Sequence, residues 1–174
     1  MSKIYVGVDN GVTGSIGIIF PEGKQPVMYQ TPTFTEQNYT KTKANISRLD
    51  VNKFQEILET ELSEYLNNPE HTIEMIVERP MVNPARLTAS ISAVRCLEAT
   101  LIAISKYSNI SFRYCDSKEW QKIVLPSGVK GSNELKKVSK DIGIRLFKNC
   151  QDVINKQKDA DSLLIAYWFR VIDK

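Results

Sequence analysis

The most constraining feature of the sequence is a carboxylate at the end of an apolar run near the N-terminus. Residues 3–9 read KIYVGVD, an alternation rich in β-branched residues that predicts a strand, and Asp9 ends it. Asn10-Gly11 follows at once and favours a turn with positive φ, so SIGIIF at 15–20 is predicted to be the antiparallel return strand. An ionised carboxylate beside a buried strand is costly unless something pairs with it. The question is therefore what pairs with Asp9.

Alternating helices and strands follow this hairpin along the chain. The apolar spacing predicts strands at 27–31, 72–78 and 109–115, helices at 50–66, 84–106, 132–147 and 159–172, a short helix around Trp120, and a loop over 32–49. With the two hairpin strands, this order gives five strands, some of them joined by helical crossovers. The chain is therefore predicted to be an α/β protein with a mixed five-stranded sheet flanked by helices.

Length and composition favour one domain and exclude several classes of site. The 174 residues suit a single domain over 1–174, and 25% charged residues are ordinary for a globular chain. We expect no membrane partner, because no apolar run approaches the roughly 20 residues of a span and no leader is evident. Three scattered cysteines fit a reducing cytoplasm. His71 is the only histidine, which disfavours a His/Cys zinc site, so any metal would be held by oxygen.

Four carboxylates are predicted to meet at one edge of the sheet. Asp9 ends the first strand and Glu78 the fourth, and the carboxyl ends of such strands share an edge. Asp159 and Asp161 open the final helix, where the helix dipole favours negative charge. Their mutual repulsion calls for a cation, and hard ions such as Mg²⁺ or Mn²⁺ prefer oxygen ligands.

Each acid also has an alternative reading that the sequence leaves open. Asp9 before Asn-Gly is common turn chemistry. Glu78 could pair with Arg79 or Arg86, and Asp159 could serve only as a helix N-cap.

Positive charge is concentrated in one part of the chain. Residues 106–148 carry 10 basic and 4 acidic side chains, whereas residues 1–105 carry 9 basic and 12 acidic ones. Such a segment favours a phosphate-rich partner. A solvated surface is the alternative reading.

Three stretches, VGVDNGVTGSIGII, IVERP and KDADSLLIAYW, resemble in this order the motifs of RuvC-type Holliday junction resolvases of bacteria and their phages. The resemblance implies a ribonuclease H-like fold of the retroviral integrase superfamily and a homodimer. It further implies two Mg²⁺ ions, which Mn²⁺ can replace, held by four catalytic acids. These acids map onto Asp9, Glu78, Asp159 and Asp161. We expect a phage member, acting in the cytoplasm of a bacterial or phage-infected cell.

One of these four assignments departs from the family pattern. The family usually has an aspartate three residues before the last acid, where this chain has Lys158, so Asp159 is the available substitute. Positions two apart on a helix point about 200° from each other. Asp159 can therefore join the site only if it lies at or before the helix cap.

The resemblance also implies which residues meet DNA. Met81, in the loop after Glu78, occupies the place of an apolar wedge that can unstack bases, and Arg79 stands beside it. In the basic segment the candidates for phosphate contacts are Lys118, Lys122, Lys130, Lys136, Lys137 and Lys140. Trp120 is expected to be a core residue rather than a base-stacking one.

The function that follows is metal-dependent, structure-selective cleavage of four-way and other branched DNA junctions by paired nicking. A ribonuclease H-like nuclease acting on RNA–DNA hybrids and a non-catalytic junction binder are the alternatives, and forks or flaps remain possible substrates. A dinucleotide site is disfavoured because Asp9 stands where the first glycine of G-x-G-x-x-G would be, and its charge would repel a pyrophosphate.

Overall fold

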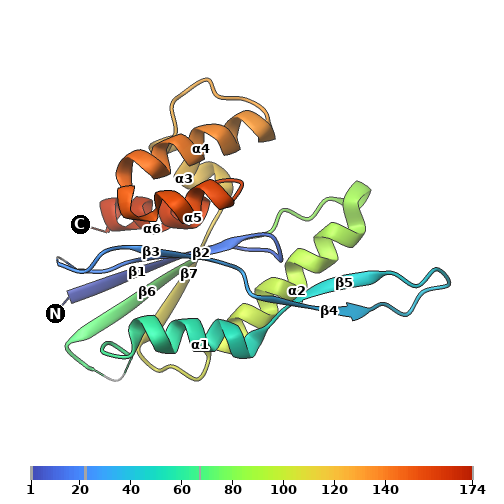
Figure 1. Cartoon of the computed structure of the whole chain (residues 1–174), viewed down its shortest axis with the longest axis horizontal. Coiled ribbons are helices and arrows are strands. Elements are labelled where there is room, and N and C mark those ends of the chain that lie inside the picture. The colour runs from blue at the N-terminus through green and yellow to red at the C-terminus, as the bar shows by residue number, and fades with distance from the viewer. Residues whose placement is uncertain (1, 22, 67, 174) are drawn as a thin grey trace.

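A mixed sheet of five strands forms the centre of the molecule, as predicted (Figure 1). The computed structural model describes residues 2–21, 23–66 and 68–173. The spatial order is β3-β2-β1-β6-β7. The strands are β1 Ser2–Asp9, β2 Ser15–Ile19, β3 Val27–Gln30, β6 His71–Glu78 and β7 Ile110–Cys115.

The register of these strands explains why the acids of β1 and β6 share an edge. β1 runs antiparallel to β2, with Asp9 opposite Ser15, and parallel to β6, with Val8 opposite Val77. β6 in turn runs parallel to β7. Asp9 and Glu78 are therefore the last residues of neighbouring parallel strands. The predicted convergence at one sheet edge is confirmed for the backbone.

Helices cover both faces of the sheet (Figure 1). One face carries α1 Val51–Leu62 and α2 Leu87–Ile104, the latter preceded by the 3-10 turn η1 Pro84–Arg86. The other face carries α3 Ser117–Val124, α4 Ser132–Leu146, η2 Lys148–Cys150, α5 Gln151–Lys156 and α6 Asp161–Ile172. The segment 148–156 was not predicted. Alternation along β1 feeds both cores, because Ile4 and Val6 face α1 and α2 while Tyr5 faces α6.

Two glycines let α6 lie unusually close to the sheet. A Cβ on Gly7 would stand 2.1 Å from the Ser162 carbonyl oxygen, and one on Gly17 would stand 2.6 Å from the Leu163 nitrogen. Ser15 Oγ donates to Ser162 Oγ at 2.8 Å and ties the start of α6 to β2. The close approach fixes the N-terminal end of α6 beside the end of β1.

The predicted loop over 32–49 is wrong, because this segment forms a β-hairpin. Strands β4 Thr33–Gln37 and β5 Asn45–Leu49 pair antiparallel in a separate two-stranded sheet that projects from the body (Figure 1). Most of its residues are exposed or half-buried, and Leu49 at the end of β5 is the one that is buried. Hydrophobic periodicity, which is the main signal for a strand, is weak in a ribbon that buries so little of either face.

Helix α2 corrects the expectation that no apolar run approaches the length of a membrane span. The 21 residues of Pro84–Ile104 have a mean hydropathy of 1.5 in their most apolar 18-residue window, so length and composition alone would allow a membrane span. Only 28% of that window is buried. A single helix of this kind indicates a span weakly. What it shows directly is an apolar surface, since Leu87, Ile91 and Ile102 are exposed.

Candidate active site

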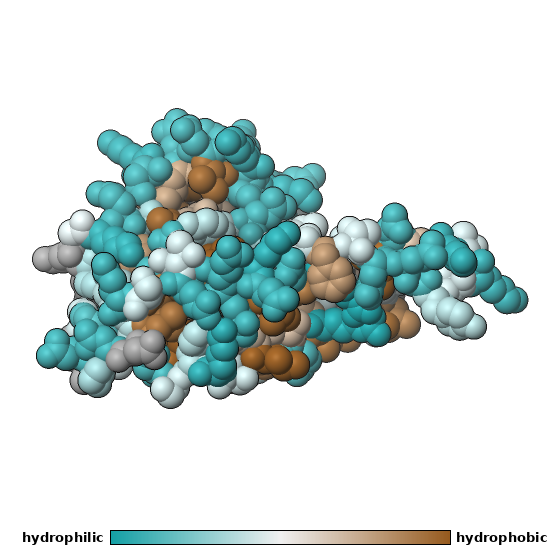
Figure 2. Space-filling view, turned by 60° about the horizontal axis from the view of Figure 1, so that its bottom comes forward, coloured by the Kyte–Doolittle hydropathy of each residue, from teal (hydrophilic) through white to brown (hydrophobic). Residues whose placement is uncertain are grey.

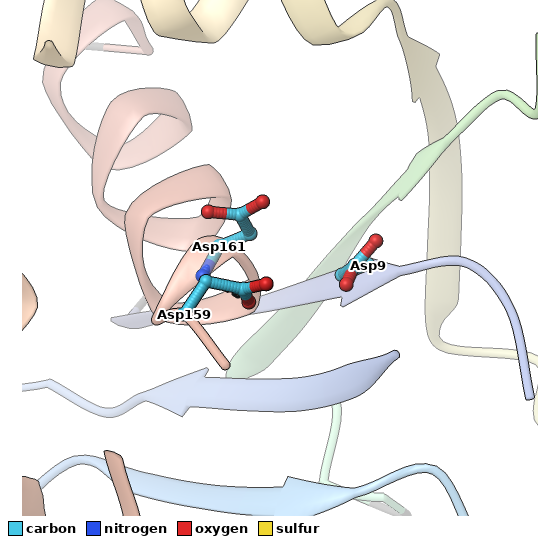
Figure 3. A group of neighbouring side chains, drawn as sticks. All are labelled: Asp9, Asp159 and Asp161. Atoms are coloured by element: carbon cyan, nitrogen blue, oxygen red, sulfur yellow. Dashed lines mark hydrogen bonds between the residues drawn. The ribbon is translucent and has the colours of Figure 1, made fainter. Parts of the chain in front are cut away.

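Three of the four predicted acids come together at the edge of the sheet. Asp9 ends β1, Asp161 is the first residue of α6, and Asp159 lies two residues before it. Each offers a carboxylate oxygen that lies within 4.8 Å of those of the other two. Figure 3 shows Asp159 and Asp161 at the start of α6, across a short gap from Asp9. Three carboxylates at this spacing could share a cation.

Asp159 reaches the cluster because it precedes the helix. The N-cap of α6 is Ala160, so Asp159 is outside the helical turn and is free of the 200° separation that would apply inside it. The alternative role of Asp159 as the N-cap is therefore wrong, although its Oδ1 accepts the Asp161 backbone N–H at 3.3 Å. The condition set for Asp159 by the sequence, a place at or before the cap, is confirmed.

The cluster is electrostatically unbalanced. Burial raises the pKa of Asp9 well above its usual range, and the charges of Asp161, Glu78 and Asp159 raise it further. Burial and then the charge of Asp159 raise the pKa of Asp161 to about 7. Of the three aspartates, Asp159 is the one that forms an ion pair with a described residue: Lys136 Nζ lies 3.1 Å from Asp159 Oδ2. A single lysine beside three aspartates leaves the cluster short of positive charge.

Ser139 of α4 positions the start of α6. Its hydroxyl hydrogen-bonds to Asp161 Oδ1, and it accepts the Ala160 backbone N–H at 3.2 Å. The hydrogen bond opposes the rise in the pKa of Asp161 that burial causes. Nothing in the sequence singles Ser139 out, since its role depends on how α4 packs against α6.

Glu78 ends β6 beside this cluster, with its carboxylate held by α3. Ser117 Oγ donates to its Oε1 at 2.9 Å, and Trp120 Nε1 donates to its Oε2 at 2.7 Å. Burial raises the pKa of Glu78, while these two hydrogen bonds lower it. Arg79, offered by the sequence as a partner, pairs instead with Asp116 at 2.9 Å. The role of Glu78 as a metal ligand stays a prediction.

Trp120 is a core residue, as expected, and also a hydrogen-bond donor to the site. Its side chain is fully buried among the residues that pack under α6. Sequence reasoning missed the second role. The available signal was the capping box at Asp116 and Glu119, which fixes α3 directly after β7 and so beside the end of β6.

The residues predicted to meet DNA fall into two groups. Met81 has 83% of its surface exposed and lines, with Arg79 and Glu78, a cavity of about 330 Å³. Four of the six lysines are exposed, namely Lys118, Lys122, Lys130 and Lys137. The other two are engaged within the protein: Lys136 pairs with Asp159, and Lys140 Nζ donates to the Asn155 carbonyl at 2.9 Å, at the end of α5.

Comparison with solved structures finds the same arrangement of elements. The sequence matches no family model and no curated protein. The RuvC of T. thermophilus in complex with a Holliday junction substrate superposes with a TM-score of 0.54 at 13% identity, covering 98% of this chain and 94% of that chain. The chain has the RuvC fold. A second structure of Thermus thermophilus RuvC gives a TM-score of 0.49, also at 13% identity, covering 98% of this chain and 96% of that chain.

The likeness to this RuvC structure extends over nearly the whole chain. It confirms the predicted ribonuclease H-like architecture, with an antiparallel hairpin joined to parallel strands.

Proposed function

We propose that this protein is a divalent-metal-dependent endonuclease that resolves four-way DNA junctions by paired nicking. The observation that carries the proposal is the gathering of Asp9, Asp159 and Asp161 within 4.8 Å on a RuvC fold. A single nuclease domain over 1–174, of phage origin and acting in the cytoplasm of a bacterial or infected cell, belongs to the same proposal. Forks and flaps are further branched substrates of this kind.

The donor set fits hard divalent cations. It consists of carboxylate oxygens, which Mg²⁺ and Mn²⁺ prefer. Burial and then the neighbouring carboxylates raise the pKa of Asp9 and of Asp161, and a bound cation would favour the ionised form of both. Asp9, Asp159 and Asp161 would hold a pair of ions together with Glu78, whose carboxylate Ser117 and Trp120 fix at the end of β6. When bound, two such ions supply Lewis-acid activation of water and neutralise charge on the leaving oxygen of an in-line phosphodiester displacement.

The chain's own side chains would prepare this chemistry. Ser139 fixes the rotamer of Asp161, and Lys136 neutralises part of the charge of Asp159 next to the position of a scissile phosphate. His71 contributes no general base here, because it lies at the first residue of β6, at the opposite end of the strand from Glu78.

The surroundings of the acids suit a branched DNA. Arg79 and the exposed thioether of Met81 border the cavity beside Glu78, where an apolar side chain could enter between unstacked bases. The exposed lysines of α3, of the following loop and of α4 would contact phosphates and make binding strongly salt-dependent.

A two-fold homodimer would account for paired nicking. Helix α2 exposes Leu87 by 60% and Ile102 by 67%, so a second copy packed on this helix would cover apolar surface that the monomer leaves in water. An isologous interface would hold two acid clusters against two strands of one junction.

The test is cleavage of a synthetic four-way junction with labelled strands in Mg²⁺ or Mn²⁺. Wild type is expected to nick two opposing strands symmetrically, and Asp9→Asn is expected to bind without cutting. Asp173→Asn, at the far end of α6, is the matched control and keeps activity. Binding without cutting by wild type would favour the non-catalytic reading, and cutting of RNA–DNA hybrids alone would favour the hybrid nuclease.

A further inference from the structure

The β4–β5 hairpin, residues 33–49, which we call the arm, leaves the body at the same sheet edge as the acids. Gln30 at the end of β3 pairs with Ser15, and Ser15 pairs with Asp9, so the three residues form one row across the sheet. The Thr31 backbone N–H then donates to the Gly14 carbonyl at 3.0 Å. The arm therefore begins beside the candidate active site and extends away from it (Figure 1).

Contacts within the arm join its two strands and its tip. Five residue pairs join β4 to β5, and the Glu36 carboxylate pairs with Arg48 across the two strands. At the tip, Asn38 Oδ1 accepts the Ala44 backbone N–H at 2.8 Å and the Thr40 hydroxyl at 3.0 Å. Such local bonds preorganise a surface and reduce the entropy lost on binding.

The chemistry of the tip is that of a phosphate-binding surface. Residues 37–49 contain no carboxylate, and Lys41 and Lys43 are exposed at the tip with uncharged hydroxyl and amide neighbours. Tyr39 is fully exposed, with its aromatic ring in solvent. Figure 2 shows the projection, with hydrophilic side chains over much of its far end. Exposed cationic and aromatic side chains on a loop suit a sugar–phosphate backbone.

From this placement and chemistry we infer that the arm grips the duplex that flanks the cleavage point, with Lys41 and Lys43 on its phosphates. Eight residues from the root of the arm to its tip span up to about 26 Å at roughly 3.3 Å each. That reach corresponds to about eight base pairs at 3.4 Å per step. The inference rests on the proposed function, since it takes the duplex to be an arm of the junction bound at the acids.

The test compares binding by Lys41→Ala/Lys43→Ala with binding by the charge-matched control Lys24→Ala/Lys106→Ala. The control lysines lie at the opposite edge of the sheet, before β3 and after α2. Binding is measured by fluorescence anisotropy in EDTA, on four-way junctions with 20-base-pair arms and on linear duplex. We expect the arm variant to bind the long junction about tenfold more weakly. The plot of log association constant against log salt concentration should also become less steep, its negative slope shrinking in magnitude by about 2. The control is expected to stay within twofold of wild type.

Shortening the junction arms gives a second readout that a general loss of charge would not produce. With arms of about 6 base pairs, below the reach of the tip, wild type and the arm variant are expected to bind equally. A constant ratio between them at every length would overturn the inference, as would unchanged binding of the long junction by the arm variant.

Two further outcomes separate this inference from its rivals. The arm and α2 line an apolar groove of about 760 Å³ with Phe34, Ile46 and Ile91 among its walls. If Lys41→Ala/Lys43→Ala changes the oligomeric state in light scattering and not DNA binding, the arm is a protein interface and the inference is wrong. If wild type binds duplex but never cuts junctions, the proposed function fails, while weaker duplex binding by the arm variant still supports the DNA-contacting arm.

Discussion

Carboxylates lie at both ends of the strands of the central sheet, which we call its two edges, but their pKa values are shifted in opposite directions. At the edge opposite the acid cluster, Asp173 accepts Lys3 Nζ at 2.7 Å and the Tyr5 hydroxyl at 3.1 Å. Glu59 accepts Lys106 Nζ at 2.7 Å and the Tyr107 hydroxyl at 2.8 Å. The hydrogen bonds from Lys3 and Lys106 lower the pKa of Asp173 and of Glu59, respectively.

At the cluster edge the direction is reversed. Burial raises the pKa of Asp9, of Asp161 and of Glu78, and other carboxylates add to each rise. The chain can thus satisfy its carboxylates locally, and does so where they stabilise the fold. At the ends of β1 and β6 it gathers them without enough cations. The difference marks the cluster edge as built for a positively charged ligand.

The largest expected effect comes from removing one charge from the unsatisfied edge. Asp9→Asn should lower the rate of junction cleavage by at least about a thousandfold, about 4 kcal/mol of transition-state stabilisation, because a ligand oxygen is lost. We expect Mg²⁺ to raise the melting temperature of wild type, and the same variant should lose that rise. Single-turnover cleavage and thermal unfolding, each with and without Mg²⁺, measure both effects. Cleavage by the variant within tenfold of wild type would remove Asp9 from the site.

The next effect tests how Glu78 is held. Trp120→Phe keeps an aromatic ring in the core but removes the donor to Glu78, so cleavage should fall by about 10- to 100-fold. Loss of that donor should also raise the pKa of Glu78 and move the acid limb of the pH–rate profile to higher pH. The matched control is Trp168→Phe in α6, since Trp168 Nε1 is buried without a hydrogen-bond partner among the described residues. Equal losses in both variants would mean that Trp120 acts only through packing.

A smaller effect follows from protonation of the cluster. Protons compete with the metal for Asp161, whose pKa is about 7, so the apparent Mg²⁺ affinity should fall by up to about tenfold per pH unit below 7. In metal-free protein the folded state keeps this proton to higher pH than the unfolded chain does, so the free energy of unfolding should decrease as pH rises from about 4 to about 7. Urea unfolding in EDTA at pH 5 and pH 8 tests the sign. The predicted sign would be contradicted if the free energy of unfolding of wild type increased from pH 5 to pH 8 and Asp161→Asn showed the same increase.

The smallest effect is expected at the satisfied edge. Asp173→Asn and Glu59→Gln each break an exposed ion pair, so each should lower the melting temperature by no more than about a few degrees. Neither should change cleavage by more than about twofold, as ordinary surface substitutions leave the site intact. A large loss of cleavage with either variant would mean that the two edges do not differ in function as proposed.

The sheet and the placing of Asp9 and Glu78 at the ends of neighbouring strands could be predicted because strong local signals determine them. The β-branched runs that end at Asp9 and Glu78 fix two strands, and parallel pairing brings their ends to one edge. The arm could not be predicted in the same way, since Leu49 is the one residue of Thr33–Gln37 and Asn45–Leu49 that is buried.

The details of the site were harder to predict, because they depend on packing between distant elements. Ser139 touches Asp161 only through the contact of α4 with α6. Lys136 and Lys140 belong to the same basic run as Lys137, yet the turn of the helix directs them to internal partners and leaves Lys137 exposed. A charge count along the sequence does not separate these cases.

The central claim is that the acids of the cluster edge trap divalent ions, and the most direct measurement is anomalous scattering from crystals grown with Mn²⁺. The account predicts Mn²⁺ peaks coordinated by carboxylate oxygens of Asp9, Asp159 and Asp161 at about 2.0–2.3 Å, with a second peak that also contacts Glu78. Mn²⁺ bound only elsewhere on the protein, with Asp9 left without an ion at high occupancy of the other sites, would contradict it.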